Sequence, residues 1–171
     1  MIEVRNITKS FDGKTILHNV SATFETGKTN LIIGQSGSGK TVLVKSIIGL
    51  IKPEEGEILF DGRDIMKMDS AQVKELRKEI GMLFQGSALF DSETVLGNVA
   101  FPLTMFTDMT PAEIHDRAQF CIERVNLKGA ESKYPSEISG GMQKRVAIAR
   151  AIALNPKYLF LSLIHISEPT R

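Results

Sequence analysis

The sequence has little of what marks secreted, membrane-spanning or nucleic-acid-binding proteins. It holds one cysteine, Cys121, so an internal disulfide framework is excluded and a reducing compartment is favoured. No apolar run approaches the roughly 18 residues of a membrane span, and the first residues lack the pattern of a secretion signal. Lysine and arginine total 21 against 20 acidic residues, for a net charge of +1. We therefore expect a soluble, cytoplasmic protein with one sizeable core and no nucleic-acid partner.

The most informative motif is GQSGSGKT at residues 34 to 41, which matches the phosphate-loop pattern G-x-x-x-x-G-K-[ST]. The apolar run 31–33 predicts a strand before it, and a helix is predicted from Lys40 to about Leu50. Glycines let successive amide N–H groups converge on an anion, and the positive end of a helix strengthens the attraction. Lys40 is placed to reach terminal phosphates and Thr41 to bind Mg²⁺. The predicted nucleotide contacts are Gly34, Gln35, Ser36, Gly37, Ser38, Gly39, Lys40 and Thr41.

Elsewhere the apolar pattern alternates between strands and helices. It predicts an N-terminal β layer with a turn at Asp12-Gly13, and helices capped by Ser70, Thr110 and Ser139. The alanine-rich face of the helix after Ser139 is expected to pack on a sheet. Because parallel strands need helical crossovers, the alternation around a phosphate loop predicts an α/β core with a parallel sheet. The stretch from 87 to 137 has helices but little strand signal, so we expect it to be an inserted helical subdomain.

A second anion-binding pattern, ISGGMQ, begins at Ile138. Ser139 offers a hydroxyl and two glycines allow close backbone approach at a helix start. Behind a phosphate loop, this motif resembles the LSGGQ signature of ABC transporter ATP-binding subunits, with Ile138 replacing Leu and Met142 replacing Gln. The resemblance implies a P-loop NTPase fold and a head-to-tail homodimer. In that dimer, Ser139, Gly140 and Gly141 would bind the γ-phosphate held by the second copy.

The same resemblance assigns two further residues. Gln85 matches the glutamine of the family's Q-loop, which ligands Mg²⁺ and orients the attacking water in catalysis. Phe11 matches the aromatic residue that stacks on adenine, with simple core packing as the alternative interpretation. The implied cofactors are ATP and Mg²⁺. The implied partner is a membrane permease, which would place the chain at the inner face of the cytoplasmic membrane.

Residues 85 to 103, followed by SGGM instead of SGGQ, are similar to ATPases of MCE-type (Mla-like) phospholipid transport systems. Apolar residues in and after this segment predict a permease contact surface, with core packing as the alternative: Leu89, Phe90, Val95, Phe101 and Phe106. An ABC ATPase for another solute and a soluble scaffold ATPase remain open. A DNA-repair ATPase fits less well because no heptads or cysteine clusters lie between Gln85 and Ser139, and the signature argues against a P-loop kinase or GTPase.

The end of the chain departs from the family pattern. The apolar strand that should end in Asp-Glu begins at Asn155, but positions 162 and 163 hold Ser and Leu, and His165 and Glu168 do not replace the missing switch histidine and base. Residues 161 to 171, LSLIHISEPTR, correspond codon by codon to a sequence resembling a transposase adapter used for sequencing libraries. We expect an incomplete nucleotide-binding domain over 1–160, a non-native tail over 161–171, an exposed apolar sheet edge and negligible ATP hydrolysis.

Overall fold

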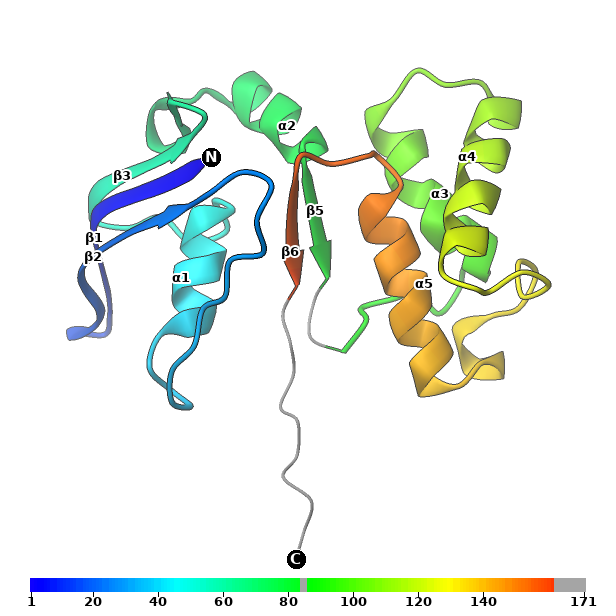
Figure 1. The fold of residues 1–171 in the computed structure, drawn as a ribbon, viewed down its shortest axis with the longest axis horizontal. Coiled ribbons are helices and arrows are strands. Elements are labelled where there is room, and N and C mark those ends of the chain that lie inside the picture. Colours follow the sequence, from blue (N-terminus) through cyan, green and yellow to red (C-terminus); the bar gives the residue numbers. More distant parts are fainter. Residues whose placement is uncertain (84–85, 162–171) are drawn as a thin grey trace, which may run out of the picture. The chain divides into compact units, whose positions relative to one another are not determined.

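The computed structural model describes residues 1–83 and 86–161 (Figure 1). Its contacts divide the chain into two compact units, residues 1–73 and 74–171. The first unit carries the phosphate loop and the second carries the Ser-Gly-Gly motif. Gln85 and positions 162 and 163 lie outside the described residues. Within the described part, no helix combines the length and apolar character needed to cross a bilayer.

An antiparallel sheet of order β2-β1-β3-β4 forms the first unit, as predicted for the N-terminal layer. Its elements are β1 (Ile2–Phe11), β2 (Lys14–Phe24), α1 (Lys40–Ile47), β3 (Glu55–Phe60), β4 (Arg63–Asp64) and the 3-10 turn η1 (Ile65–Lys67). One face of the sheet is apolar: Ile7, Ile58 and Phe60 have no exposed surface. Leu43 and Ile47 are the buried apolar residues of α1. Burial of these side chains, each contributing roughly 1.5–3 kcal/mol, stabilises the unit.

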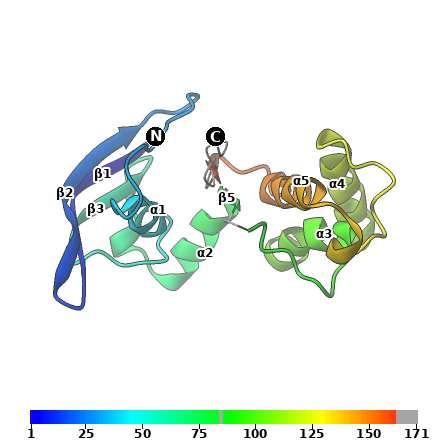
Figure 2. The ribbon, with the colours of Figure 1, turned by 90° about the horizontal axis from the view of Figure 1, so that it is seen from below.

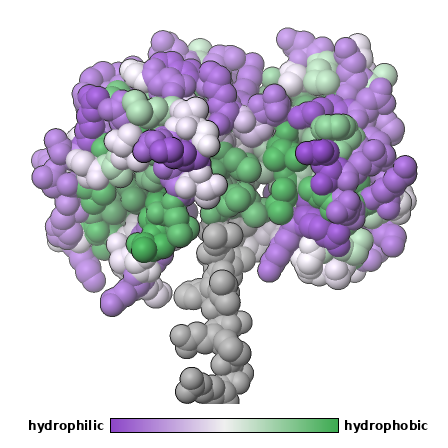
Figure 3. Space-filling view, in the orientation of Figure 1, coloured by the Kyte–Doolittle hydropathy of each residue, from purple (hydrophilic) through white to green (hydrophobic). Residues whose placement is uncertain are grey.

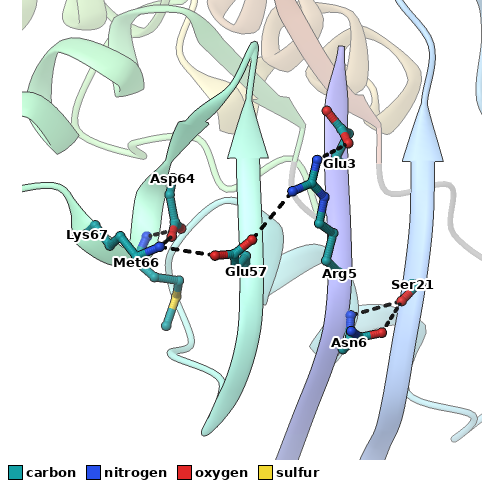
Figure 4. A network of polar contacts seen from close by, with 8 residues as sticks. All are labelled: Glu3, Arg5, Asn6, Ser21, Glu57, Asp64, Met66 and Lys67. Carbon is teal, nitrogen blue, oxygen red and sulfur yellow. Dashed lines mark hydrogen bonds and ion pairs between the residues drawn. The ribbon is translucent and has the colours of Figure 1, made fainter.

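Charged side chains cross the strands of this sheet in a ladder that is exposed except at Asp64 (Figure 4). Arg5 on β1 lies 2.7 Å from Glu3 and 3.6 Å from Glu57 on β3. Glu57 in turn accepts from the Lys67 ammonium at 3.1 Å, and Lys67 lies 3.0 Å from Asp64. Exposed ion pairs contribute little to stability individually, at most about 1 kcal/mol. The ladder therefore favours the observed strand register, whereas the apolar face accounts for most of the stability.

The second unit pairs a short parallel sheet with helices. Strands β5 (Ile80–Leu83) and β6 (Tyr158–Leu161) are parallel, with Ile80 opposite Tyr158. The helices are α3 (Val95–Phe106), α4 (Pro111–Arg124) and α5 (Gly140–Ile152), with the 3-10 turn η2 (Pro135–Glu137), and α2 (Ser70–Lys78) links the two units. Figure 2 shows α3, α4 and α5 grouped together. One buried cluster joins them, including Val99, Leu103, Ile122, Val146 and Ala149.

The alanine-rich helix α5 also packs on the sheet, as expected. A Cβ atom at Gly81 of β5 would lie only 2.3 Å from the carbonyl oxygen of Ala151. This position therefore excludes any larger residue, since backbone atoms cannot yield as side chains do. Ala149, by contrast, belongs to the cluster shared with α3 and α4. Small side chains thus let α5 contact a strand on one side and two helices on the other.

The predicted helix caps are confirmed at two positions of three. Thr110 and Glu113 form the expected capping box, in which the Thr110 N–H donates to the Glu113 carboxylate at 2.7 Å. Ser139 caps α5. The prediction for Ser70 is wrong, because Asp69 accepts from the Gln72 N–H at 2.8 Å and Ser70 is the first helical residue. An aspartate one residue earlier caps equally well, so composition alone could not choose between them.

The strand predicted over residues 31–33 is also wrong. These residues carry no strand pairing among the described residues, and Leu31 and Ile33 are 70% and 82% exposed. A strand requires a hydrogen-bonded neighbour, and an apolar run alone does not supply one. Leu159 and Leu161 of β6 are also exposed. Figure 3 shows apolar side chains at the surface beside polar ones.

Candidate nucleotide-binding site

The phosphate loop leads directly into α1, and Gly39 makes that junction possible. Gly39 is the residue before the helix, has φ +91° and places no side chain over the first-turn amides. A Cβ atom there would lie 3.1 to 3.2 Å from Leu17 and Ile16 of β2. No acidic residue stands in the first turn of α1. The exposed loop therefore presents uncapped helix amides to solvent, which is the geometry that attracts phosphate.

Lys40 lies folded over the loop that precedes it. Its ammonium donates to the carbonyl oxygens of Gly34 and Gln35, both at 2.6 Å. The loop itself is closed by a bond from the Ser38 N–H to the Gln35 carbonyl at 3.2 Å. An ammonium has three N–H donors, so one proton of Lys40 is left for a phosphate oxygen. The lysine is thus positioned by the loop before any ligand is bound.

Thr41 supplies the one predicted metal ligand that the structure describes. It is exposed in the first turn of α1. A free hydroxyl oxygen is a donor that Mg²⁺ accepts, usually together with phosphate oxygens and water. Gln85, the other predicted ligand, lies outside the described residues. The described residues contain no cluster of three or more His, Cys, Asp or Glu side chains suited to a metal, so phosphate would have to complete the coordination.

Phe11 lies at the end of β1 in the same unit as the loop. Leu17, which Gly39 approaches, is opposite Lys9 in the β1–β2 register. Phe11 is two residues further along the strand, a distance of about 7 Å. Its ring is 43% exposed, so it is not a core aromatic residue. The structure therefore brings the predicted adenine contact and the predicted phosphate contacts to the same side of one hairpin.

The Ser-Gly-Gly motif forms the second exposed helix start, in the second unit. The Ser139 hydroxyl oxygen accepts from the Met142 N–H at 3.3 Å, which leaves its own O–H free to donate. Gly140 and Gly141 are exposed, and nothing lies within 4 Å of a Cβ atom built at Gly140. The first turn of α5 has no acidic residue. Met142 is half-buried against the helical core, so the departure from the LSGGQ consensus points away from this opening.

Gln143 is a site residue that the sequence reasoning missed. Its side-chain amide donates to the Pro135 carbonyl at 2.8 Å and so ties α5 to the turn η2 before it. The Glu137 carboxylate accepts from the Tyr134 N–H at 2.7 Å at the start of that turn. These bonds hold η2 in place next to α5, and so position Ser139 at the start of the helix. In the sequence, the only indication of this role was that Gln143 is the polar residue that ends the segment ISGGMQ.

An aromatic groove of about 280 Å³ lies within the second unit, lined by residues of β5, α3, α5 and the loop before α3 that include Met82, Phe90, Phe101, Phe106 and Arg150. The rings of Phe90 and Phe101 pack with centroids 4.6 Å apart. The Arg150 guanidinium lies 5.7 Å from the Phe90 centroid and donates to the Ser87 carbonyl at 2.9 Å. Burial lowers the pKa of Arg150 below its ordinary value. Arg150 forms no ion pair within the described ranges.

The predicted contact surface is thus divided by the structure. Phe90, Phe101 and Phe106 line the groove, whereas Val95 is fully buried and Leu89 packs against the helical core. Core packing was therefore the correct alternative for these last two residues.

The wall of the groove is held by Asn98, which is fully buried on α3. Its carbonyl oxygen accepts from the Phe90 N–H at 2.8 Å. Its amide group donates to the carbonyls of Phe90, Glu93 and Thr94 at 3.0 to 3.1 Å. A buried amide with all these partners rigidifies the loop it bonds. Asn98 was also missed, although an asparagine inside the apolar sequence LGNVAF was a usable signal.

Known proteins are similar to this chain in both sequence and fold. A family model described as "ABC transporter" matches residues 17–162. The intermembrane phospholipid transport system ATP-binding protein MlaF of Haemophilus influenzae is 44% identical over 169 residues, which are 99% of this chain and 62% of that protein. A probable ribonucleotide transport ATP-binding protein, mkl of Mycobacterium leprae, is 43% identical over 92% of this chain and 46% of its own length. The chain therefore spans about half to three fifths of these relatives.

The fold comparison agrees. The ATP-binding cassette MJ0796, solved as a dimer in a post-hydrolysis state with ADP and Pi, matches with a TM-score of 0.86 and 34% identity. The match covers 94% of this chain and 73% of that one. This likeness confirms the predicted fold class, a P-loop ATPase core with an antiparallel β layer and a helical subdomain.

Proposed function

Because the chain belongs to the ABC transporter family, we propose that it is an ATP-binding subunit in which two copies hold nucleotide head to tail. Phe11, the loop amides and Lys40 bind ATP in one copy, while Ser139, Gly140 and Gly141 of the other copy bind its γ-phosphate. The observation that carries the proposal is the pair of glycine-flanked helix starts without acidic residues in their first turns. The solved structure of MJ0796, a dimer bound to ADP and Pi, supports the association of two copies.

Binding follows from the geometry of the loop. The amide N–H groups at the start of α1 donate hydrogen bonds to the phosphate oxygens, and the third N–H of the Lys40 ammonium donates to a terminal oxygen. Mg²⁺, when bound, offsets the negative charge of the phosphates. Thr41 would hold it from this chain, and Gln85 is proposed as a second ligand that also orients water. The Phe11 ring adds a flat surface for the base.

The direct test is ATP-dependent association. We expect the chain to be monomeric without nucleotide and to form a dimer with saturating ATP, measured by light scattering coupled to gel filtration. A chain that binds ATP but stays monomeric at high concentration would contradict the shared site. A chain that does not bind ATP would contradict the whole proposal.

Hydrolysis is proposed to be negligible in the chain of 171 residues. Positions 162 and 163 hold Ser and Leu where the family pattern has Asp and Glu. A general base contributes about 10² to 10⁴ in rate, and the metal-associated carboxylate is replaced as well. In this proposal, residues 1–160 are the nucleotide-binding domain, 87–137 its helical subdomain and 161–171 a non-native tail. Magnesium-dependent phosphate release at several turnovers per second would contradict the proposal.

We further propose that the aromatic groove receives a segment of a membrane permease, which would hold the chain at the cytoplasmic face of the membrane. Three exposed or half-buried aromatic residues and a desolvated arginine, Arg150, favour a partner segment that is mainly apolar and carries a carboxylate. Copurification with the permease encoded by a neighbouring gene tests this. Arg150→Ala should reduce recovery of the permease, whereas Lys144→Ala, which changes an exposed residue of the same helix, should not.

Phospholipid is the proposed cargo of the complete transporter. The support is the similarity of residues 85–103 to Mla-like ATPases and the 44% identity to a protein named MlaF. The nearly equal identity to a protein named for ribonucleotide transport favours the alternative of another solute. Gene neighbourhood discriminates between them. A lipid-binding MCE protein encoded beside the permease would support phospholipid, and a soluble solute-binding protein in its place would contradict it.

A further inference from the structure

A cation lies over the ring of Phe11. The Lys9 ammonium is 5.0 Å from the ring centroid. Residues 9 and 11 are two apart on β1, so their side chains leave the strand on the same face. The Lys9 side chain is only 15% exposed, whereas Phe11 is 43% exposed. Lysine therefore covers one face of the ring, and the exposed surface is left for a ligand.

Glu54 fixes that lysine to the strand. Its carboxylate lies 2.5 Å from the Lys9 ammonium and also accepts from the Ser10 N–H at 2.9 Å. The Glu54 N–H donates to the Thr8 carbonyl at 3.0 Å. Three successive residues of β1 are thus bonded to one residue of the segment between α1 and β3. The bond to Lys9 and the bond from Ser10 hold the pKa of Glu54 below its usual value, so the Glu54 carboxylate stays ionised at neutral pH.

We propose that Lys9 and Glu54 are positioning residues that set the Phe11 ring as a platform for the purine base of a nucleoside triphosphate. The inference rests on the proposed function and extends it to residues outside the recognised motifs. A cation on one face draws π-electron density toward itself, which makes the opposite face less negative and favours stacking of an electron-rich base. The contact also restricts the ring, so less side-chain entropy is lost on binding.

This role predicts an effect on the base and not on the phosphates. Lys9→Met should raise the Kd for ATP by about two- to fivefold, the value of an exposed cation–π contact, and leave the Kd for inorganic tripolyphosphate unchanged. Glu54→Gln should act in the same direction. Lys9→Arg keeps a cation and should restore ATP affinity. Lys52→Met is the matched control, because it removes the same charge two residues from Glu54 and leaves Lys9 in place.

Isothermal titration of the full chain with ATP and with tripolyphosphate measures these values. A second readout uses the absence of tryptophan from the sequence. Phe11→Trp introduces a single fluorophore at the proposed platform, whose emission ATP should quench and tripolyphosphate should not. In that background, Lys9→Met should shift the ATP midpoint by the same factor.

The outcomes separate this inference from the function on which it rests. Equal ATP affinity for Lys9→Met and the unchanged chain overturns the inference, as does equal weakening of ATP and tripolyphosphate. If Phe11→Ala leaves ATP affinity unchanged while Lys40→Ala removes it, the result contradicts the role of the Phe11 ring and supports the phosphate site. If Lys40→Ala changes nothing, the proposed function itself is wrong.

Discussion

The Lys40 ammonium donates to the Gly34 carbonyl oxygen at 2.6 Å, so the single charged residue of the phosphate loop is bonded to the first glycine of that loop. A second bond to Gln35 holds the ammonium in place. Long lysine side chains lose roughly 2 kcal/mol of rotamer entropy when ordered. Here the loop has ordered the lysine in advance, and the binding of phosphate does not have to offset that cost again.

The first prediction concerns this lysine. Lys40→Ala should weaken ATP binding by about 10- to 100-fold, because a charge-assisted hydrogen bond contributes about 1.5–3 kcal/mol. Lys45→Ala, at the other end of α1, removes the same charge from an exposed position and should leave binding nearly unchanged. Isothermal titration with ATP measures both. Similar losses for the two variants would mean that only net charge matters.

Ser139 allows helix capping to be separated from phosphate binding. Ser139→Ala should lower the free energy of unfolding by about 1 kcal/mol, because the Met142 N–H loses its cap. Ser139→Asp keeps a capping oxygen and should retain stability, yet its charge should repel the γ-phosphate and abolish ATP-dependent dimerisation. Urea unfolding and light scattering measure the two effects. A dimer that forms normally with Ser139→Asp would exclude this residue from the shared site.

Two of the three glycines of the loop, Gly37 and Gly39, should differ in their tolerance of a side chain. Gly39→Ala places a methyl group against β2 in a positive-φ conformation, and we expect a loss of about 2 kcal/mol of stability together with weaker ATP binding. Gly37→Ala has a similar positive φ but open space around it. We expect about 1 kcal/mol from backbone strain alone. Thermal unfolding of both variants gives the comparison, and the reverse ranking would contradict the close packing at Gly39.

The capping box at the start of α4 predicts an acid-dependent loss of stability. Hydrogen bonds from the Thr110 N–H and hydroxyl lower the pKa of Glu113 below its ordinary 4.5. A carboxyl whose pKa is lower in the folded state stabilises the protein above the unfolded pKa, and this contribution disappears as pH falls through the folded pKa. Glu113→Gln should therefore be less stable than the unchanged chain at pH 7.

The unchanged chain and the Glu113→Gln variant should approach equal free energies of unfolding in acid below the Glu113 pKa. Urea midpoints measured across this range test the sign. A difference that persists undiminished in acid would show that the neutral side chain, and not the carboxylate charge, carries the effect. Glu75→Gln is a suitable control, because Glu75 is exposed and its ion pair with Lys78 lies within one helix.

Sequence patterns predicted the features that depend on residues close to one another in the sequence. The capping box at Thr110 and the glycine-rich helix start at Ser139 involve residues three positions apart, and both are confirmed. The contacts of Asn98 with the Phe90 loop and of Glu54 with β1 were not predicted. Lys9 and Glu54 lie 45 residues apart, and no local periodicity indicates which lysine meets which glutamate.

The error at residues 31–33 has a similar origin. Three apolar residues before a phosphate loop favour a strand, but a strand exists only with a hydrogen-bonded neighbour. Pairing partners come from distant parts of a chain and leave no mark in a short window. The candidate site shows the same contrast between local patterns and distant contacts. The residues of the phosphate loop were predicted from a pattern eight residues long, whereas the contacts of Asn98 and Glu54 were not predicted. The roles of Gln85 and of the Ser-Gly-Gly motif in a shared site stay predictions.

Helix α5 joins two of the features described above. Ser139 precedes its first turn, and Arg150 lies in the groove near its last turn, about 16 Å away along the axis. The residues from Met142 to Ile152 contain no proline or glycine, so no hinge interrupts the rod. A partner segment that moves α5 as a rigid body from the groove would therefore also displace Ser139, and a phosphate bound at Ser139 would restrain the groove in turn. Coupling of this kind would depend on the rigidity of one helix with a binding site at each end, and not on a series of side-chain contacts between the sites.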